Sequence, residues 1–233
     1  LDRISSKTGG VCKFVTDISD IRNSLLGEIS RLGSNLTEQI NFNYQVPHEV
    51  ELRSAFRLQP DPAPLVLGSP LIFGYMPRFG AMKVLLEFVI KEIPVEMTNF
   101  PLARGFMNYE IPRHKVKTHY VERLLFDCPI SRDPIREDPP IEILNAVKLI
   151  ALYRMQERAS EAMGKGDVTG AARHMENLAT HLLSKGEEEM AESVMKEADY
   201  IRRNQSFSED GEKRIKYGTR ALLLPAKTKE KKT

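Results

Sequence analysis

The spacing of apolar residues changes twice along the chain and divides it into three regions. In residues 1–37, a polar stretch, two glycines and the apolar run VCKFV come before apolar positions at three- and four-residue spacing. In residues 38–130, apolar and polar positions alternate with a period of two. After residue 140 the helical spacing returns and continues almost to the end. These periods predict a helix–strand–helix segment, then a set of strands, then a set of helices.

The first region has the pattern of an α/β structure. Gly9 and Gly10 follow the polar stretch, and a glycine in the left-handed conformation commonly ends a helix. VCKFV is predicted to be a strand, and Asp17 is predicted to cap the helix that follows. The apolar stripe predicted for that helix consists of Ile21, Leu25, Ile29 and Leu32. Because one strand cannot form a sheet, this segment is expected to require a partner that the chain does not contain.

The central region predicts six or seven strands. The alternation is plainest in INFNYQV and recurs in HEVELRSAFRL and LARGFMNYEI. AMKVLLEFVI is apolar on both faces over much of its length, which predicts a central strand. Strands at this spacing without helices between them favour an antiparallel immunoglobulin-like β-sandwich, with a barrel as the alternative.

The last region predicts a small antiparallel helical bundle over residues 141–224, because the loops between its helices are short. Residues 131–140 are rich in proline and predict a stiff linker, and the basic tail 225–233 is expected to be disordered. The predicted helix caps are Asp138, Asp167, and the pair Ser206 and Glu209. The apolar face predicted for the first helix consists of Leu144, Val147, Ala151, Met155, Ala159 and Ala162. The faces predicted for the next two consist of Ala171, Met175, Leu178 and Leu182, and of Met190, Val194, Ala198 and Ile201.

Charge and cysteine content exclude several classes of function. The net charge is +2, with basic and acidic residues interspersed along most of the chain, so we expect no nucleic-acid partner. The longest apolar runs are far shorter than the roughly 20 residues that cross a bilayer, so no membrane span is predicted. Cys12 and Cys128 belong to no CxxC motif, which favours a reducing, cytoplasmic location over a disulfide or zinc framework.

Motifs for catalysis or metal binding are not found in the sequence. His174 and His181 share a helix face but lie about 10.5 Å apart along its axis, too far for one metal ion to bridge. The run Glu187–Glu189 opens a helix, where negative charge complements the helix dipole. Neither a phosphate-binding glycine motif nor GxSxG occurs. We therefore predict no enzyme activity, no catalytic residue and no metal or cofactor site in this chain.

Three motifs in order resemble one known family. TGGVCKFVTDISDIRNSLLGEIS, then the predicted sandwich, then helices with GDVTGAARHMENLATHLLSKG and GEKRIKYGTRALL resemble the C-terminal half of bacterial von Willebrand factor A (VWA) domain proteins. The resemblance implies that the first motif is the last strand and last helix of a VWA domain. Since Leu1 is not an initiator methionine, the body of that domain is expected to precede it.

The family also implies metal-dependent adhesion or complex assembly, in which a DxSxS loop helps to hold a divalent cation such as Mg²⁺. That loop is not in this chain. The nearest string, Asp17, Ser19 and Ile21, has isoleucine in place of the second serine and lies at the wrong end of the domain. The resemblance therefore implies the architecture of the family for this chain, but not its metal site.

The predicted function is a non-enzymatic interaction or assembly module, a scaffold that binds a protein partner, the VWA body or a second copy of itself. The partner-interface candidates form a stripe with no evident cover in the sequence, and an exposed apolar patch commonly marks a binding surface. These candidates are Phe14, Ile21, Leu25, Ile29 and Leu32.

Two alternatives remain open at the level of sequence. One is an enzyme or ligand-binding protein with a pocket at the junction of sandwich and bundle, around His119, Glu122 and Arg123. The other is a helical peptide-binding adaptor, because the alanine-rich helices resemble tetratricopeptide repeats. The spacing of 20 residues from Gly166 to Gly186 differs from the roughly 34 of such repeats.

Overall fold

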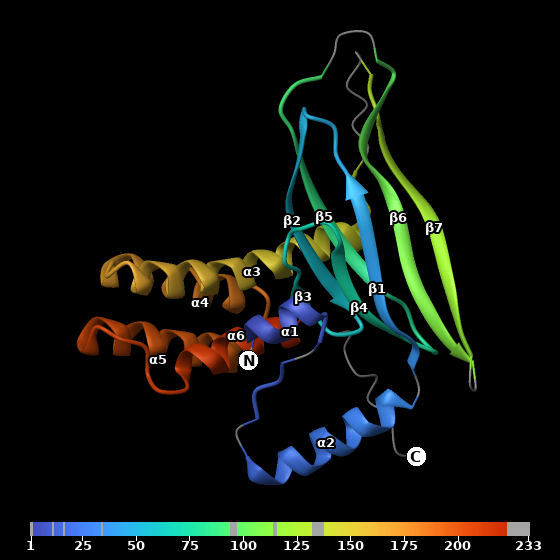
Figure 1. The fold of residues 1–233 in the computed structure, drawn as a ribbon. Helices are drawn as coiled ribbons and strands as arrows, with labels where there is room; N and C mark the ends of the chain where they lie inside the picture. The colour runs from blue at the N-terminus through green and yellow to red at the C-terminus, as the bar shows by residue number, and fades with distance from the viewer. Residues whose placement is uncertain are drawn as a thin grey trace. The chain divides into compact units, whose positions relative to one another are not determined.

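The computed structural model describes residues 2–10, 12–15, 17–33, 35–93, 97–113, 116–131 and 138–222 (Figure 1). Two compact units make up the chain, Leu1–Asp138 and Pro139–Thr233. The first unit contains two antiparallel sheets and the second contains helices, so the predicted α+β class is confirmed in this coarse form. The finer division into five segments stays a prediction, and the tail 225–233 lies outside the described residues.

Two helices lie in the N-terminal segment, α1 (Asp2–Thr8) and α2 (Ile18–Leu32). Gly9 follows α1 with a φ of 70°, the left-handed conformation predicted for the end of that helix. α2 begins directly after Asp17, also as predicted. The strand predicted for VCKFV is wrong, because residues 12–15 are described without one. A strand needs a neighbour for its backbone hydrogen bonds, and the described strands pair with one another instead.

The first sheet has the strand order β4-β1-β6-β7. Its strands are β1 (Asn35–Gln45), β4 (Leu71–Pro77), β6 (Asn99–Arg113) and β7 (Val116–Pro129). The second sheet has the order β3-β2-β5, with β2 (Val50–Gln59), β3 (Ala63–Pro64) and β5 (Lys83–Ile90). Every strand pair in the described residues is antiparallel. The sheets share one core, whose buried members are Ile40, Phe42, Leu52, Ala55, Leu65, Leu71 and Phe73.

β5 lies at the edge of its sheet, so the prediction that AMKVLLEFVI is a central strand is wrong. Its side chains from Val84 to Ile90 are all half-buried, which accounts for apolar residues on both faces without a central position. The order of the strands also differs from that of a constant-type immunoglobulin domain, where strands one, two, five and four form one sheet. The immunoglobulin-like detail is therefore not shown.

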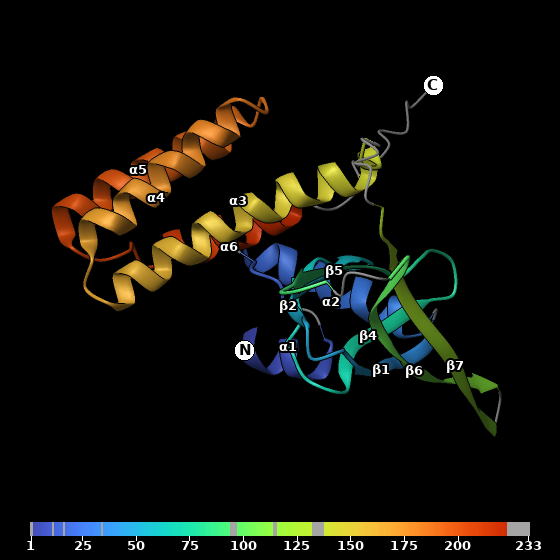
Figure 2. The same ribbon diagram turned by 90° about the horizontal axis from the view of Figure 1, so that it is seen from above.

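In the described part of the second unit, four helices surround a core of small and apolar side chains. They are α3 (Ile141–Gly164), α4 (Val168–Leu183), α5 (Glu188–Asn204) and α6 (Gly211–Ala221). α4 and α5 lie side by side in both views (Figures 1 and 2). Predicted core positions that are fully buried are Ala159, Ala171, Met175, Leu178, Leu182, Val194, Ala198 and Ile201. None of the helices in the described part of the chain is long and apolar enough to cross a bilayer.

The buried face of α3 includes Ala159 as predicted, with Met155 and Ala162 packed against the core, but it also contains positions outside the predicted stripe. Val147 is 50% exposed, whereas Ile150, Tyr153 and Gln156 are buried. Both α4 and α6 pack against α3, and the contact with α6 turns a partly polar side of α3 inward. The spacing of apolar residues within one helix does not predict that a second helix packs against its partly polar side.

Of the three caps predicted for the helices of the second unit, one is confirmed and two are wrong. Asp167 Oδ1 accepts a hydrogen bond from the Gly170 N–H at 2.8 Å. α3 begins at Ile141 after Pro140 without a side-chain cap, so Asp138 does not cap it. α6 begins at Gly211, whose N–H donates to Ser208 Oγ at 3.1 Å, so the predicted pair Ser206 and Glu209 lies outside the first turn.

Candidate interaction surfaces

α2 presents an exposed apolar surface, which we call the α2 face. Its members are Ile18, Ile21, Leu25, Leu26 and Ile29, with exposed fractions of 84%, 45%, 58%, 52% and 64%. Spacings of three and four residues place them on one side of the helix. Three of them are partner-interface candidates from the sequence. The fourth candidate, Phe14, is half-buried, and the side chain of the fifth, Leu32, lies outside the described part.

The turn after α1 is anchored to the sheets by Arg57 of β2, which is fully buried. Its Nη1 donates to the carbonyl oxygens of Gly9 and Phe73, both at 2.7 Å. Its Nη2 donates to Gly10 O at 3.0 Å, and its Nε donates to Asp61 O at 2.8 Å. Because Phe73 belongs to β4, one guanidinium joins both sheets and the N-terminal turn.

Close backbone contact strengthens this anchor. A Cβ on Gly9 would lie 2.5 Å from Gly74 Cα, and both glycines have positive φ angles of 70° and 92°. Side chains at either position would therefore separate the turn from β4. Burial lowers the pKa of Arg57, while the nearby Asp61 and Tyr75 oppose that shift.

An ion pair connects the segment after this turn with α2. Lys13 Nζ lies 2.5 Å from Glu28 Oε1, with side chains that are 43% and 38% exposed. Pairs exposed to this degree contribute little to stability because water and salt screen them. The exposed Lys13–Glu28 pair thus holds α2 only weakly. The hydrogen bonds of Arg57 are buried, whereas the α2 face is open to solvent.

The structure does not bring His119, Glu122 and Arg123 together. Side chains alternate along β7, so Glu122 points to the opposite face from the other two. His119 and Arg123 are four residues apart, about 13 Å along an extended strand. His119 Nδ1 lies 4.0 Å from Glu110 Oε1 at an exposed position. These residues do not form a catalytic constellation.

The residues present do not fit a VWA-type metal site. Within the described residues, no group of three or more His, Cys, Asp or Glu side chains could hold a metal ion. In the string nearest to DxSxS, the third position is Ile21, whose side chain has no oxygen to offer and is 45% exposed.

Sequence reasoning missed a groove on the exposed side of the first sheet, which we call the β6–β7 groove. One hollow of this groove has a volume of about 390 Å³ and is lined by Asn43, Gln45, Ser69, Arg104, Phe106 and Arg123 among others. Gly105 lies opposite Tyr44 in the β1–β6 register, and a Cβ there would lie 2.8 Å from Tyr44 Cα. The strands therefore approach closely beneath the hollow. The alternation of arginine and phenylalanine in LARGFMNYEI is the signal that could have indicated it.

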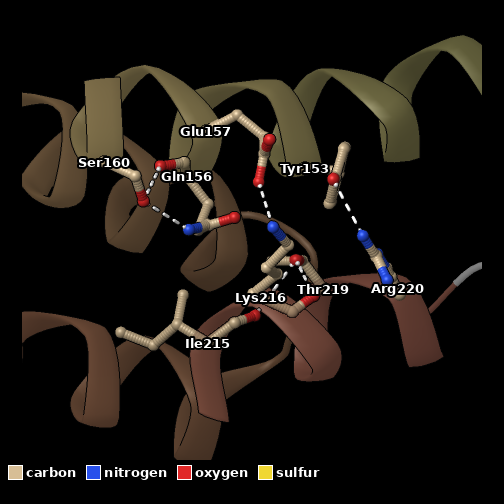
Figure 3. A network of polar contacts seen from close by, with 8 residues as sticks. All are labelled: Tyr153, Gln156, Glu157, Ser160, Ile215, Lys216, Thr219 and Arg220. Atoms are coloured by element: carbon tan, nitrogen blue, oxygen red, sulfur yellow. Dashed lines mark hydrogen bonds and ion pairs between the residues drawn. The ribbon is translucent and has the colours of Figure 1, made fainter. Parts of the chain in front are cut away.

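Polar contacts between α3 and α6 were also missed (Figure 3). Arg220 Nη2 donates to Tyr153 Oη at 3.0 Å, and its guanidinium carbon lies 5.1 Å from the centre of the Tyr153 ring. Lys216 Nζ lies 3.0 Å from Glu157 Oε1. Burial raises the pKa of Tyr153, and the charge of Arg220 offsets part of that rise. These contacts fix α6 against α3.

Comparisons with known proteins define the class of fold. Residues 141–225, less than half of the chain, match the family described as Sll0103-like, C-terminal alpha-helical domain. A solved structure, von Willebrand factor type A from Catenulispora acidiphila, is similar with a TM-score of 0.62 and 10% sequence identity. The match covers 90% of this chain and 52% of that chain, so this chain spans about half the length of its structural neighbour. A search of the curated proteins found no match.

At 10% identity the likeness shows the fold alone. The resemblance found in the sequence is therefore supported in its coarse form: the chain shares a fold with part of a VWA-type structure, and its helices match a C-terminal helical domain.

Proposed function

We propose that the chain is a non-enzymatic protein–protein interaction module of a VWA-type protein. The observation that carries this proposal is the open α2 face, with five apolar side chains between 45% and 84% exposed. Burying one such side chain is worth about 1.5–3 kcal/mol. A protein surface that covers the α2 face would therefore gain substantial binding free energy.

The proposed occupant is the body of an α/β domain of the VWA type. An amphipathic helix with one apolar stripe is the element that covers a face of a mostly parallel sheet. The solved structural neighbour is about twice as long as the matched part, which leaves room in such proteins for a further domain. A divalent cation such as Mg²⁺ would belong to that body. The cytoplasmic location, the immunoglobulin-like sandwich and the antiparallel bundle belong to the same proposal.

The test uses point substitutions on α2. Deleting residues 1–37 would also remove the Gly9 and Gly10 carbonyls from Arg57 and the first residues of β1, and would confuse folding with binding. Ile21→Glu combined with Leu25→Glu places charge on the α2 face. The matched control is Asn23→Glu, an exposed position on the other side of the same helix.

Sedimentation velocity measures self-association, and titration calorimetry measures binding of a VWA-type α/β domain from the same organism. We expect one of these interactions in the wild type, its loss in the double variant and its retention in the control. The proposal fails if the wild type shows neither interaction, or if the double variant matches the wild type. A pocket enzyme would keep its ligand in all three proteins.

A further inference from the structure

The register between β6 and β7 groups two arginines with apolar side chains on one face. Phe106 lies opposite Arg123, and Arg104 lies opposite Leu125. Their neighbours on the same strands, including Met107, Leu124 and Phe126, pack toward the core, so these four side chains point the other way. Phe106 is 52% exposed and Leu125 is 56% exposed.

The β6–β7 groove continues beyond its first hollow. A second hollow of about 480 Å³ shares Gln45 and Arg104 with the first, and Val46, Pro47, Pro101 and Ala103 complete its lining. An elongated depression with polar side chains and apolar walls can receive an extended peptide.

The charged side chains that line this groove are positive. Within the described part of the chain, neither the Arg104 nor the Arg123 side chain has a hydrogen bond or ion pair, and no carboxylate lines either hollow. The carboxylate of Asp127, on the same side of β7, lies opposite Pro101 beside the second hollow.

At the other end of the same sheet, positive and negative side chains form ion pairs. There, Lys117 Nζ lies 3.6 Å from Glu38 Oε2 and 3.6 Å from Glu110 Oε2. The hollow at that end is lined by these groups together with His119. An anionic ligand would therefore prefer the arginine end.

We propose that the β6–β7 groove binds an extended acidic peptide segment of a protein partner. Its carboxylates would accept hydrogen bonds from Arg104 and Arg123, since guanidinium groups pair with carboxylates in a planar, two-bond geometry. Apolar side chains between the acidic ones would contact Phe106 and Leu125. This surface is separate from the α2 face, so the two proposals can fail independently.

The probe is a fluorescein-labelled peptide of alternating glutamate and leucine, with a lysine–leucine peptide of the same length as its counterpart. Fluorescence anisotropy with the full chain measures both affinities. We expect binding of the acidic peptide, at least tenfold weaker binding of the lysine peptide, and a loss of affinity as salt is raised.

The variants are Arg104→Ala combined with Arg123→Ala, Phe106→Ala alone, and Lys117→Ala as the control at the other end of the sheet. Losing both charge-assisted contacts should weaken binding by about tenfold or more, while the control stays within about twofold. Circular dichroism and urea unfolding establish that each variant folds. The Ile21→Glu, Leu25→Glu protein should bind the acidic peptide like the wild type.

Two results would overturn the proposal: equal binding of the acidic and lysine peptides, or unchanged affinity in the folded double arginine variant. Tighter binding of an oligouridine than of the acidic peptide would also overturn it, because the groove would then recognise a nucleic acid instead.

Discussion

At the scale of single residues, Arg57 is a buried charge that needs several hydrogen-bond acceptors around it. It places a cation in a fully buried site, where carbonyl oxygens of Gly9, Gly10, Asp61 and Phe73 accept its hydrogen bonds. Removing the guanidinium would leave these oxygens without donors in a place that water does not reach. The side chain therefore couples the N-terminal turn to the folding of both sheets.

Arg57→Met is expected to lower the free energy of unfolding by about 3 kcal/mol or more, because several buried acceptors lose their partner at once. The measurement is the urea midpoint of unfolding. Arg53→Met is the matched control on β2, since the Arg53 side chain is 67% exposed and forms a surface pair with Glu87. A shift of similar size in both variants would mean that Arg57 is not an anchor.

Tyr153 gives the second prediction at this scale, a dependence of stability on pH. Burial raises its pKa in the folded chain above the value of about 10 that it has when unfolded. Well below pH 10 both states hold the proton. As the pH rises further, the unfolded state releases the proton first, so the free energy of unfolding falls. Tyr153→Phe removes this part of the loss.

The stability of wild type and Tyr153→Phe should therefore converge between pH 9 and about 11, as measured by urea unfolding at each pH. Arg220, Glu157 and Lys216 surround the hydroxyl and are present in both proteins, so their own titration largely cancels in the comparison. A difference between the two proteins that stays constant across this range would contradict the prediction.

At the scale of elements, two amphipathic helices with similar patterns have opposite surroundings. α2 leaves its apolar stripe open, whereas α4 buries Ala171, Met175, Leu178 and Leu182 completely. The difference arises because α3 and α5 both pack against α4. The same periodicity in the sequence thus corresponds to a core helix in one unit and to an exposed surface in the other.

Substitutions in these two helices should therefore differ in their effect on the isolated chain. Leu178→Ala is expected to lower the free energy of unfolding by about 2–5 kcal/mol through lost burial and a cavity. Leu25→Ala, at a side chain that is 58% exposed, should change it by less than about 0.5 kcal/mol. Urea unfolding of both variants checks this. A large loss for Leu25→Ala would show that the α2 face is covered within the chain.

At the scale of the whole molecule, the two compact units have separate cores. The buried members of the helical core lie between residues 152 and 215, with Leu149 and Leu222 packed against them. Those of the sheet core lie between residues 40 and 73, with residues up to Phe126 packed against them. The family match also lies entirely within the helical unit. A unit that completes its own core can fold by itself.

Residues 139–233 expressed alone should therefore be helical and unfold cooperatively, as followed by circular dichroism during heating. A matched fragment that ends at residue 204 lacks α6, and with it Ile215 and the contact of Arg220 with Tyr153. It should melt at a lower temperature. Gradual, non-cooperative melting of the longer fragment would show that the units depend on each other.

The sequence predicted most element positions, because helix and strand periodicity is a local property. The Asp167 cap was predictable for the same reason, since its partner is only three residues away. The strand at VCKFV and the central place of β5 were wrong, since both depend on which strand lies alongside. The β6–β7 groove was not found because it depends on the pairing of Phe106 with Arg123, residues 17 positions apart.

By itself, the sequence determined where the chain forms helices and strands, where Gly9 ends a helix, and which side of α2 is apolar. The tertiary structure decided the sheet order, the burial of Arg57 beneath two glycine carbonyls, and the grouping of two arginines over β6 and β7. The physical reason is the distance along the chain over which each interaction acts. Backbone periodicity and capping act over a few residues, whereas burial, strand register and charge neutralisation depend on which distant segments pack together.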